Sequence, residues 1–160
     1  MRDDERLHAG LIGQQGSRAR LNTPALVIDR DALGHNIAAM AAFAAARGIA
    51  LRPHAKTHKS HEIARLQIEA GAIGICCAKL GEAEAIAELG GVDSVLITSP
   101  VVTDQAITRL IALHPALGEL RVVVDHARNV AALERAAARL TRPLGVLIDI
   151  DPGIRRTGVT

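Results

Sequence analysis

The residues best equipped for chemistry are crowded into one octapeptide, Arg52-Pro53-His54-Ala55-Lys56-Thr57-His58-Lys59. A short apolar run at 49–51 precedes it, and a polar helix start follows at Ser60. Cationic and imidazole side chains this close together repel one another when all are charged. That repulsion favours an uncharged amine, which is the form that attacks a carbonyl carbon. The pattern therefore predicts either a reactive lysine at a strand end or a solvated basic loop.

The elements that must position this octapeptide alternate between strand-like and helical patterns. We expect strands at 23–29, 49–53, 73–77, 94–98, 120–124 and 144–150, and helices at 31–48, 60–70, 81–89, 103–113 and 127–140. Such alternation predicts right-handed β-α-β units and a parallel sheet. No G-x-G-x-x-G follows a strand, so a dinucleotide site is not expected.

The last predicted strand and its loop run straight to Thr160 without a closing helix. A closed (β/α)8 barrel requires eight strands and typically about 250 residues. We therefore predict an α/β fold that is the N-terminal part of such a barrel, truncated after about five strands. Residues 1–21 show no periodicity and are expected to be a poorly structured leader, with the partial barrel at 22–160.

Composition narrows the classes of partner. The 160 residues carry a net charge of +2, with one Phe and no Trp or Tyr, so nucleic-acid binding is not expected. No apolar run is long enough to cross a bilayer, and the acidic and basic start lacks the apolar core of a signal peptide. Cys76 and Cys77 are neighbours on a predicted strand and point to opposite faces, which makes a disulfide between them unfavourable. We expect no membrane partner and a cytoplasmic location.

Polar side chains follow five successive predicted strands. In a parallel barrel the carboxyl ends of the strands meet at one edge, so residues from all five ends are expected near one another. This clustering favours a functional site over solvated loops. The residues are His54, Lys56 and His58; Lys79 and Glu82; Thr98 and Ser99; Asp125 and His126; and Asp149, Asp151, Arg155 and Arg156.

The octapeptide resembles the pyridoxal-phosphate lysine motif of the D-threonine aldolase and D-serine dehydratase family, fold-type III enzymes related to alanine racemase. Three further stretches, at 23–29, 74–83 and 151–159, resemble family segments in the same order and spacing. The resemblance covers about residues 22–160. It implies a pyridoxal 5'-phosphate cofactor and an alanine racemase-type TIM barrel.

The resemblance implies that Lys56 is the Schiff-base lysine, with Lys59 as the alternative. It also places Arg156 near the phenolic oxygen of the cofactor, where a guanidinium would keep that oxygen ionised. Arg155 is the alternative for this role.

The neighbours of Lys56 carry less certain roles. If the segment is extended, His54 and His58 lie on the same side as Lys56 and could shuttle protons. Alternatively they are core histidines satisfied by hydrogen bonds. Arg52 would lie near Lys56 and the cofactor, or would form an ion pair inside the barrel.

For the parent protein, the resemblance implies a lyase acting on small β-hydroxy D-amino acids. D-Threonine aldolase, which yields glycine and an aldehyde by retro-aldol cleavage, is favoured. The alternative is a D-serine or D-threo-3-hydroxyaspartate dehydratase; an amino-acid racemase and a non-catalytic pyridoxal-phosphate-binding protein remain further alternatives. The resemblance also implies a divalent metal, Mn or Zn, with ligands beyond Thr160, and a homodimer at full length. Residues 1–160 alone are expected to be inactive.

Overall fold

The computed structural model describes residues 8–160. The chain divides into two compact units, Met1–Gly34 and His35–Thr160. In the described part of the first unit, two short 3-10 helices, η1 (Ala9–Leu11) and η2 (Ser17–Arg20), precede an extended segment that leads into helix α2 (Arg30–Ala45). The predicted leader falls here, and residues 1–7 of it lie outside the described part.

The strand predicted at 23–29 is wrong. These residues pair with no strand among residues 8–160, and Leu26 is fully exposed while Val27 and Ile28 are more than half exposed. An apolar segment becomes a strand only where a neighbouring backbone takes up its hydrogen bonds.

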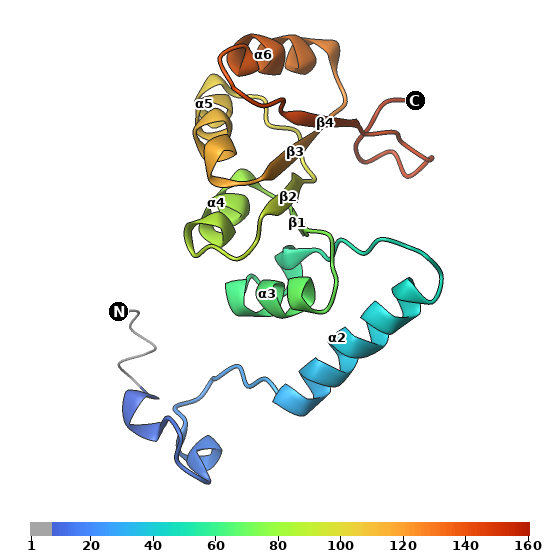
Figure 1. Cartoon of the computed structure of the whole chain (residues 1–160). Coiled ribbons are helices and arrows are strands. Elements are labelled where there is room, and N and C mark those ends of the chain that lie inside the picture. The colour runs from blue at the N-terminus through green and yellow to red at the C-terminus, as the bar shows by residue number, and fades with distance from the viewer. Residues whose placement is uncertain (1–7) are drawn as a thin grey trace. The chain divides into compact units, whose positions relative to one another are not determined.

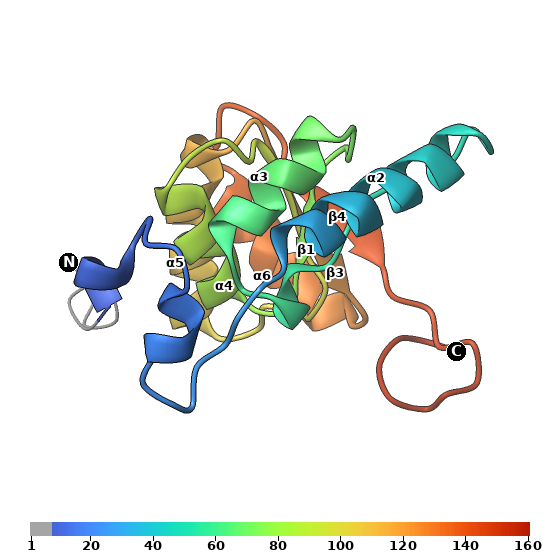
Figure 2. The same cartoon turned by 90° about the horizontal axis from the view of Figure 1, so that it is seen from below.

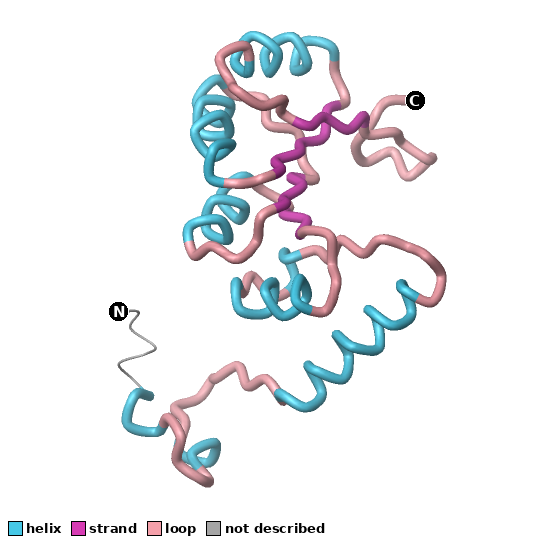
Figure 3. Tube along the Cα trace, viewed as in Figure 1, coloured by secondary structure: helices cyan, strands magenta, loops and turns pink. Residues whose placement is uncertain are grey.

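The second unit contains a parallel sheet in the order β1-β2-β3-β4. Helices alternate with its strands along the chain, as Figure 3 shows. The strands are β1 (Ile75–Cys77), β2 (Ser94–Ile97), β3 (Glu119–Val124) and β4 (Gly145–Ile148), and the helices are α3 (His61–Glu69), α4 (Leu80–Glu88), α5 (Asp104–Leu113) and α6 (Ala127–Ala137), with 3-10 turns η3 (Ala55–Thr57) and η4 (His114–Ala116). Together with α2, these four strands and four helices confirm the predicted α/β alternation from residue 30 onward.

One face of the sheet carries the core. Helices α4, α5 and α6 lie along this face (Figures 1 and 2). Alternate strand residues such as Ile75, Val95 and Val122 are fully buried against helix residues that include Ile86 and Leu110. The opposite face carries the intervening residues. Burial on a pleated strand alternates with period two, which is why neighbouring residues meet such different surroundings.

The segment predicted as the strand at 49–53 runs beside β1 without forming a regular ladder. The Leu51 carbonyl accepts the Ile73 N–H at 2.9 Å, the Pro53 carbonyl accepts the Cys76 N–H at 2.7 Å, and His54 bridges Cys76 in parallel. Pro53 has no N–H to donate, so pairing stays one-sided at this position. The segment nevertheless occupies the place of a strand next to β1.

Within residues 8–160, none of the helices combines the length and apolarity needed to cross a membrane.

Candidate active site

The parallel register places the octapeptide at one edge of the sheet. His54 pairs with Cys76, Cys76 with Leu96, and Leu96 with Arg121. These paired residues lie side by side across the sheet. The loops that follow their strands therefore emerge at one shared edge, the carboxyl edge, as can be followed in Figure 1. This register agrees with the expectation from the sequence that the polar residues that follow several strands lie at one edge.

Lys56 projects from this edge as an exposed side chain. It is the middle residue of η3, and the preceding Ala55 is 1% exposed and anchors the turn in the core. Among residues 8–160, Lys56 has no ion-pair partner. A turn anchored in the core thus presents an accessible primary amine.

His54 caps this turn. Its Nδ1 accepts the backbone N–H of Lys56 at 3.2 Å, and its Nε2 lies 3.1 Å from the hydroxyl of Thr98. Burial lowers the pKa of His54, and the positive charge of Lys56 lowers it further, while the Glu82 carboxylate opposes both effects. Burial and the charge of Lys56 therefore favour the neutral imidazole.

His58 faces away from this cluster, toward helix α3. Its Nδ1 accepts the N–H of Ser60 at 3.0 Å, and burial lowers its pKa. Its Nε2 and the Oε1 of the nearby Gln67 are both buried, and neither has a hydrogen-bond partner of normal geometry among the described residues.

The expectation that His54, Lys56 and His58 share one side is wrong. It assumed an extended chain, but residues 55–57 form a 3-10 turn that rotates successive side chains by about 120°. His54 consequently points to Thr98, and His58 points to α3.

Lys59 has different surroundings from Lys56. Its Nζ lies 4.0 Å from Oε1 of Glu82, and its backbone has a φ of 49°. Glu82 itself accepts the N–H of Ala78 at 2.8 Å. The amine of Lys59 therefore faces a carboxylate held at the start of α4.

Arg52 lies two residues before His54 and makes an ion pair on the face of the sheet opposite the core. Its guanidinium donates to Ser94 Oγ at 2.9 Å and to Glu119 Oε2 at 3.1 Å, and its side chain is 13% exposed. Glu119 also accepts from Ser94 and Arg121. These contacts support the ion-pair interpretation of Arg52 over the one that places it beside Lys56.

Gly74 makes this ion pair possible. A Cβ at this position would lie 2.0 Å from the Arg52 guanidinium and 2.6 Å from the Ser94 carbonyl oxygen. The side chain of Arg52 thus crosses the backbone just before β1, where only a glycine leaves room.

Arg156 lies in the loop that follows β4. The Asp151 carboxylate accepts the N–H groups of Gly153 and Arg155 at 2.8 and 2.9 Å, and these bonds hold its pKa below the usual range. The loop is closed by the pairing of Ile150 with Val159. Arg155 and Arg156 are both exposed on it. Lys56 precedes β1 and Arg156 follows β4, so the two residues lie toward opposite ends of the strand order β1-β2-β3-β4.

Sequence reasoning missed the roles of Thr98, Ser94 and Gly74. Thr98 was visible only as a polar residue after a strand. A glycine inside a strand pattern signals a close approach of another group, which is the signal that could have identified Gly74. Ser94 carried no signal, because its role depends on strand register.

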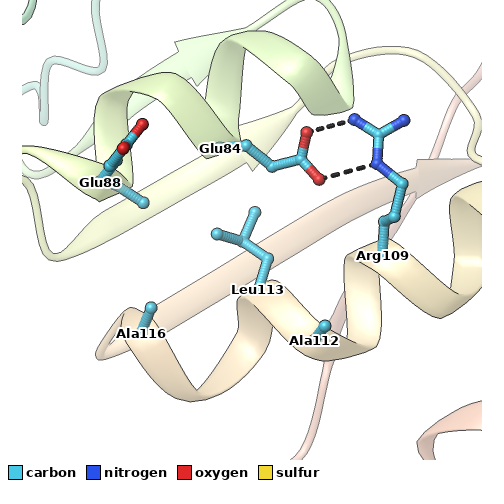
Figure 4. Close-up of a pocket in the computed structure, with 7 residues that line it drawn as sticks. Glu84, Glu88, Arg109, Ala112, Leu113 and Ala116 are labelled. Atoms are coloured by element: carbon cyan, nitrogen blue, oxygen red, sulfur yellow. Dashed lines mark hydrogen bonds and ion pairs between the residues drawn. The ribbon is translucent and has the colours of Figure 1, made fainter.

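A separate groove of about 310 Å³ lies between α4 and α5. Figure 4 shows Glu84 and Arg109 paired at its rim, above an apolar floor that includes Ala112 and Leu113. This groove belongs to the outer helix layer, and no residue from the carboxyl edge lines it.

Among residues 8–160, no group of three histidine, cysteine or acidic side chains is arranged to hold a metal ion.

Residues 28–160 match the family described as alanine racemase, N-terminal domain. The chain belongs to this family. The fold is accordingly the N-terminal part of an alanine racemase-type barrel, as the resemblance implied.

Within the alanine racemase N-terminal domain family, the chain is similar to several lyases. It is 41% identical to the 3-hydroxy-D-aspartate aldolase of Paracoccus denitrificans over 89% of this chain and 37% of that protein. A crystal structure of D-threonine aldolase from Filomicrobium marinum superimposes with a TM-score of 0.84 at 38% identity, covering 88% of this chain and 38% of that one. The D-threo-3-hydroxyaspartate dehydratase of Delftia sp. is 34% identical over 91% of this chain and 38% of that protein. The chain therefore spans little more than a third of the length of these relatives.

Proposed function

We propose that the full-length protein is a pyridoxal-phosphate-dependent lyase acting on small β-hydroxy D-amino acids, with Lys56 as its cofactor lysine. The observation that carries this proposal is the exposed amine of Lys56, fixed by a 3-10 turn at the carboxyl edge of the sheet. The similarity to two aldolases and a dehydratase that act on hydroxy D-amino acids supports it.

The donor set at this edge fits the cofactor. Pyridoxal phosphate supplies an aldehyde carbon that an amine attacks and a ring that takes up electrons when a bond to the substrate α-carbon breaks. Lys56 offers an accessible primary amine, and Arg156 offers an exposed guanidinium suited to an ionised oxygen. Arg52 is already engaged by Ser94 and Glu119, so we assign it to the scaffold and not to the cofactor.

The metal implied by the resemblance does not fit the described residues, which contain no suitable ligand cluster. One solved structure of a D-threo-3-hydroxyaspartate dehydratase variant is of the metal-free form. We place any metal ligands outside residues 8–160 and assign no step of the reaction to a metal here.

Among lyases we favour an aldolase. The relatives that are 41% and 38% identical are a 3-hydroxy-D-aspartate aldolase and a D-threonine aldolase, while the dehydratase is 34% identical. We keep D-threonine as the first substrate to test. The Paracoccus relative is a specific reason to test 3-hydroxy-D-aspartate beside it.

Product analysis separates these activities. The full-length protein is incubated with pyridoxal phosphate, with and without Mn²⁺, and with each substrate. An aldolase forms glycine together with acetaldehyde from D-threonine or glyoxylate from 3-hydroxy-D-aspartate. A dehydratase instead forms ammonia together with 2-oxobutanoate or oxaloacetate. The absence of all these products, with the cofactor bound at Lys56, would contradict the lyase proposal and favour a racemase or a non-catalytic binding protein.

We also propose that the full-length protein is a cytoplasmic homodimer. Light scattering of the purified protein tests its dimeric state, and cell fractionation tests its location.

A further inference from the structure

His54 lies between two hydrogen bonds that specify the position of its ring proton. Its Nδ1 accepts the Lys56 N–H at 3.2 Å, and its Nε2 lies 3.1 Å from Thr98 Oγ1. A ring nitrogen that accepts an N–H carries no proton itself. In the neutral ring the proton is therefore on Nε2, from which it is donated to Thr98.

Thr98 has a hydrogen-bonding pattern that matches this assignment. Its hydroxyl donates to the Cys77 carbonyl oxygen at 3.2 Å, and its backbone N–H donates to the same oxygen at 2.8 Å. Because the only hydroxyl proton is used on Cys77, the oxygen remains available to accept from His54. The opposite tautomer would place two donors face to face at Lys56.

We propose that Thr98 and His54 form a tautomer lock that fixes the backbone of Lys56, so that His54 is a positioning residue and not the acid or base of the reaction. This inference rests on the proposed function and deepens it. Both ring nitrogens of His54 are occupied by protein groups, so neither is free for a substrate. The hydrogen bond from Lys56 to His54 holds the turn from which the amine of Lys56 projects. The contacts of His54 with Thr98, and of Thr98 with Cys77, connect that turn to the ends of β2 and β1.

The lock depends on a neutral ring. Protonation of Nδ1 would replace an acceptor with a donor opposite the Lys56 N–H. Burial of the ring and the positive charge of Lys56 lower the pKa of His54. The carboxylate of Glu82 raises it. The lock therefore holds above the lowered pKa of His54 and opens as the pH falls through it.

Two substitutions of His54 separate positioning from proton transfer. His54→Asn keeps a side-chain acceptor that commonly binds the N–H two residues later but does not titrate, whereas His54→Ala removes the acceptor. In the full-length protein, mass spectrometry follows the rate at which pyridoxal phosphate forms a borohydride-reducible bond to Lys56. We expect His54→Ala to slow this rate about fivefold, the factor by which loss of a cap typically lowers the population of the capped turn, and His54→Asn to stay within about twofold of the wild type.

The pH profile adds a readout that a general loss of structure would not produce. The ratio of the His54→Asn rate to the wild-type rate cancels every pH effect that the two proteins share. This ratio should rise as the pH falls below the pKa of His54. A His54→Asn variant as slow as His54→Ala, or a ratio independent of pH, overturns the positioning role.

Thr98 is tested without the cofactor. Nitrogen NMR of the full-length protein labelled at histidine reports the tautomer of His54, whose signals are those missing in His54→Asn. Thr98→Ser should keep the Nε2–H tautomer. Thr98→Val leaves selection of the tautomer to the Lys56 N–H alone, so the fraction of Nδ1–H should rise above that of the wild type. An Nδ1–H fraction in Thr98→Val equal to that of the wild type overturns the lock. If Lys56 forms no reducible bond even in the wild type, the proposed function fails, while this measurement still decides the lock.

Discussion

Lys56 and Lys59 lie three residues apart in sequence but in different surroundings. Lys59 faces Glu82 at 4.0 Å, whereas Lys56 has no ion-pair partner among the described residues. We expect Lys56→Arg, which keeps the charge but removes the primary amine, to abolish the borohydride-reducible adduct and product formation. Lys59→Arg is the matched control and should change the rate less than about fivefold, since it loses at most an exposed ion pair. An adduct that survives Lys56→Arg and disappears in Lys59→Arg would reverse the assignment.

The sequence identified the candidate residues of the octapeptide, but it did not show in which directions their side chains point. Residue types and spacing were enough to single out Lys56. The turn at 55–57 has no apolar periodicity of its own, because it is held by the His54 cap and the buried Ala55. Those contacts depend on neighbouring strands, so the separation of His54 from His58 became visible only in three dimensions.

Gly74 provides a prediction about packing. Gly74→Ala places a methyl group within 2.6 Å of the Ser94 carbonyl oxygen, and this backbone atom cannot move aside as the Arg52 side chain can. We expect a loss of about 1–3 kcal/mol in the free energy of unfolding, measured by urea denaturation of the full-length protein. Gly81→Ala in α4 is the control, because its added methyl meets no atom within 4 Å. It should leave stability unchanged or raise it by up to about 1 kcal/mol. Equal stabilities of the two variants would contradict the close approach at Gly74.

At the level of elements, the helices could be predicted well and the first two strands could not. Helix periodicity is local, and capping residues such as Ser60 and Thr103 bond the first turns of α3 and α5 as their sequences suggest. Strands need partners. Residues 23–29 find none among the described residues, and Pro53 interrupts the pairing of 49–53 with β1. The same apolar pattern therefore gave a regular strand at β1 and an irregular segment before it.

The ion network of Arg52, Ser94, Glu119 and Arg121 joins the octapeptide segment to β2 and β3. Hydrogen bonds from Ser94 and then Arg121 hold the pKa of Glu119 below its ordinary value. A lowered carboxyl pKa stabilises the fold above the unfolded value of about 4.3, and this contribution disappears as the pH falls through the folded pKa. We expect Glu119→Gln to reduce the urea midpoint at pH 7, with a difference from the wild type that shrinks toward pH 3.

Glu84→Gln is the control for this prediction. Glu84 pairs with Arg109 between α4 and α5, where both side chains are about one-third to one-half exposed. Glu84 makes a single exposed ion pair with Arg109, whereas Glu119 accepts hydrogen bonds from Arg52, Ser94 and Arg121. The midpoint at pH 7 should therefore change less in Glu84→Gln than in Glu119→Gln. A Glu119→Gln difference that is the same at both pH values, or no larger than that of Glu84→Gln, would mean that the network does not stabilise the sheet.

At the scale of the whole molecule, residues 35–160 leave part of the sheet uncovered. Val146 and Ile148 of β4 are 47% and 70% exposed, although their register partners Val122 and Val124 on the same face are 0% and 3% exposed. Strands of parallel sheets are normally covered on both faces. The relatives, of which this chain spans 37–38%, contain further chain that could supply such cover.

We therefore expect a chain limited to residues 1–160 to be inactive and prone to associate. Its exposed strand edge and apolar β4 face favour self-association, and Lys56 would lack groups that we place outside the described residues. The measurement compares this chain with the full-length protein in three assays: binding of a hydrophobic dye, light scattering over a range of concentrations, and product formation from D-threonine. The short chain should bind more dye, scatter more as concentration rises, and form no product. Product formation by residues 1–160 would show that the carboxyl edge described here carries the whole reaction, and would contradict our placement of the remaining groups elsewhere.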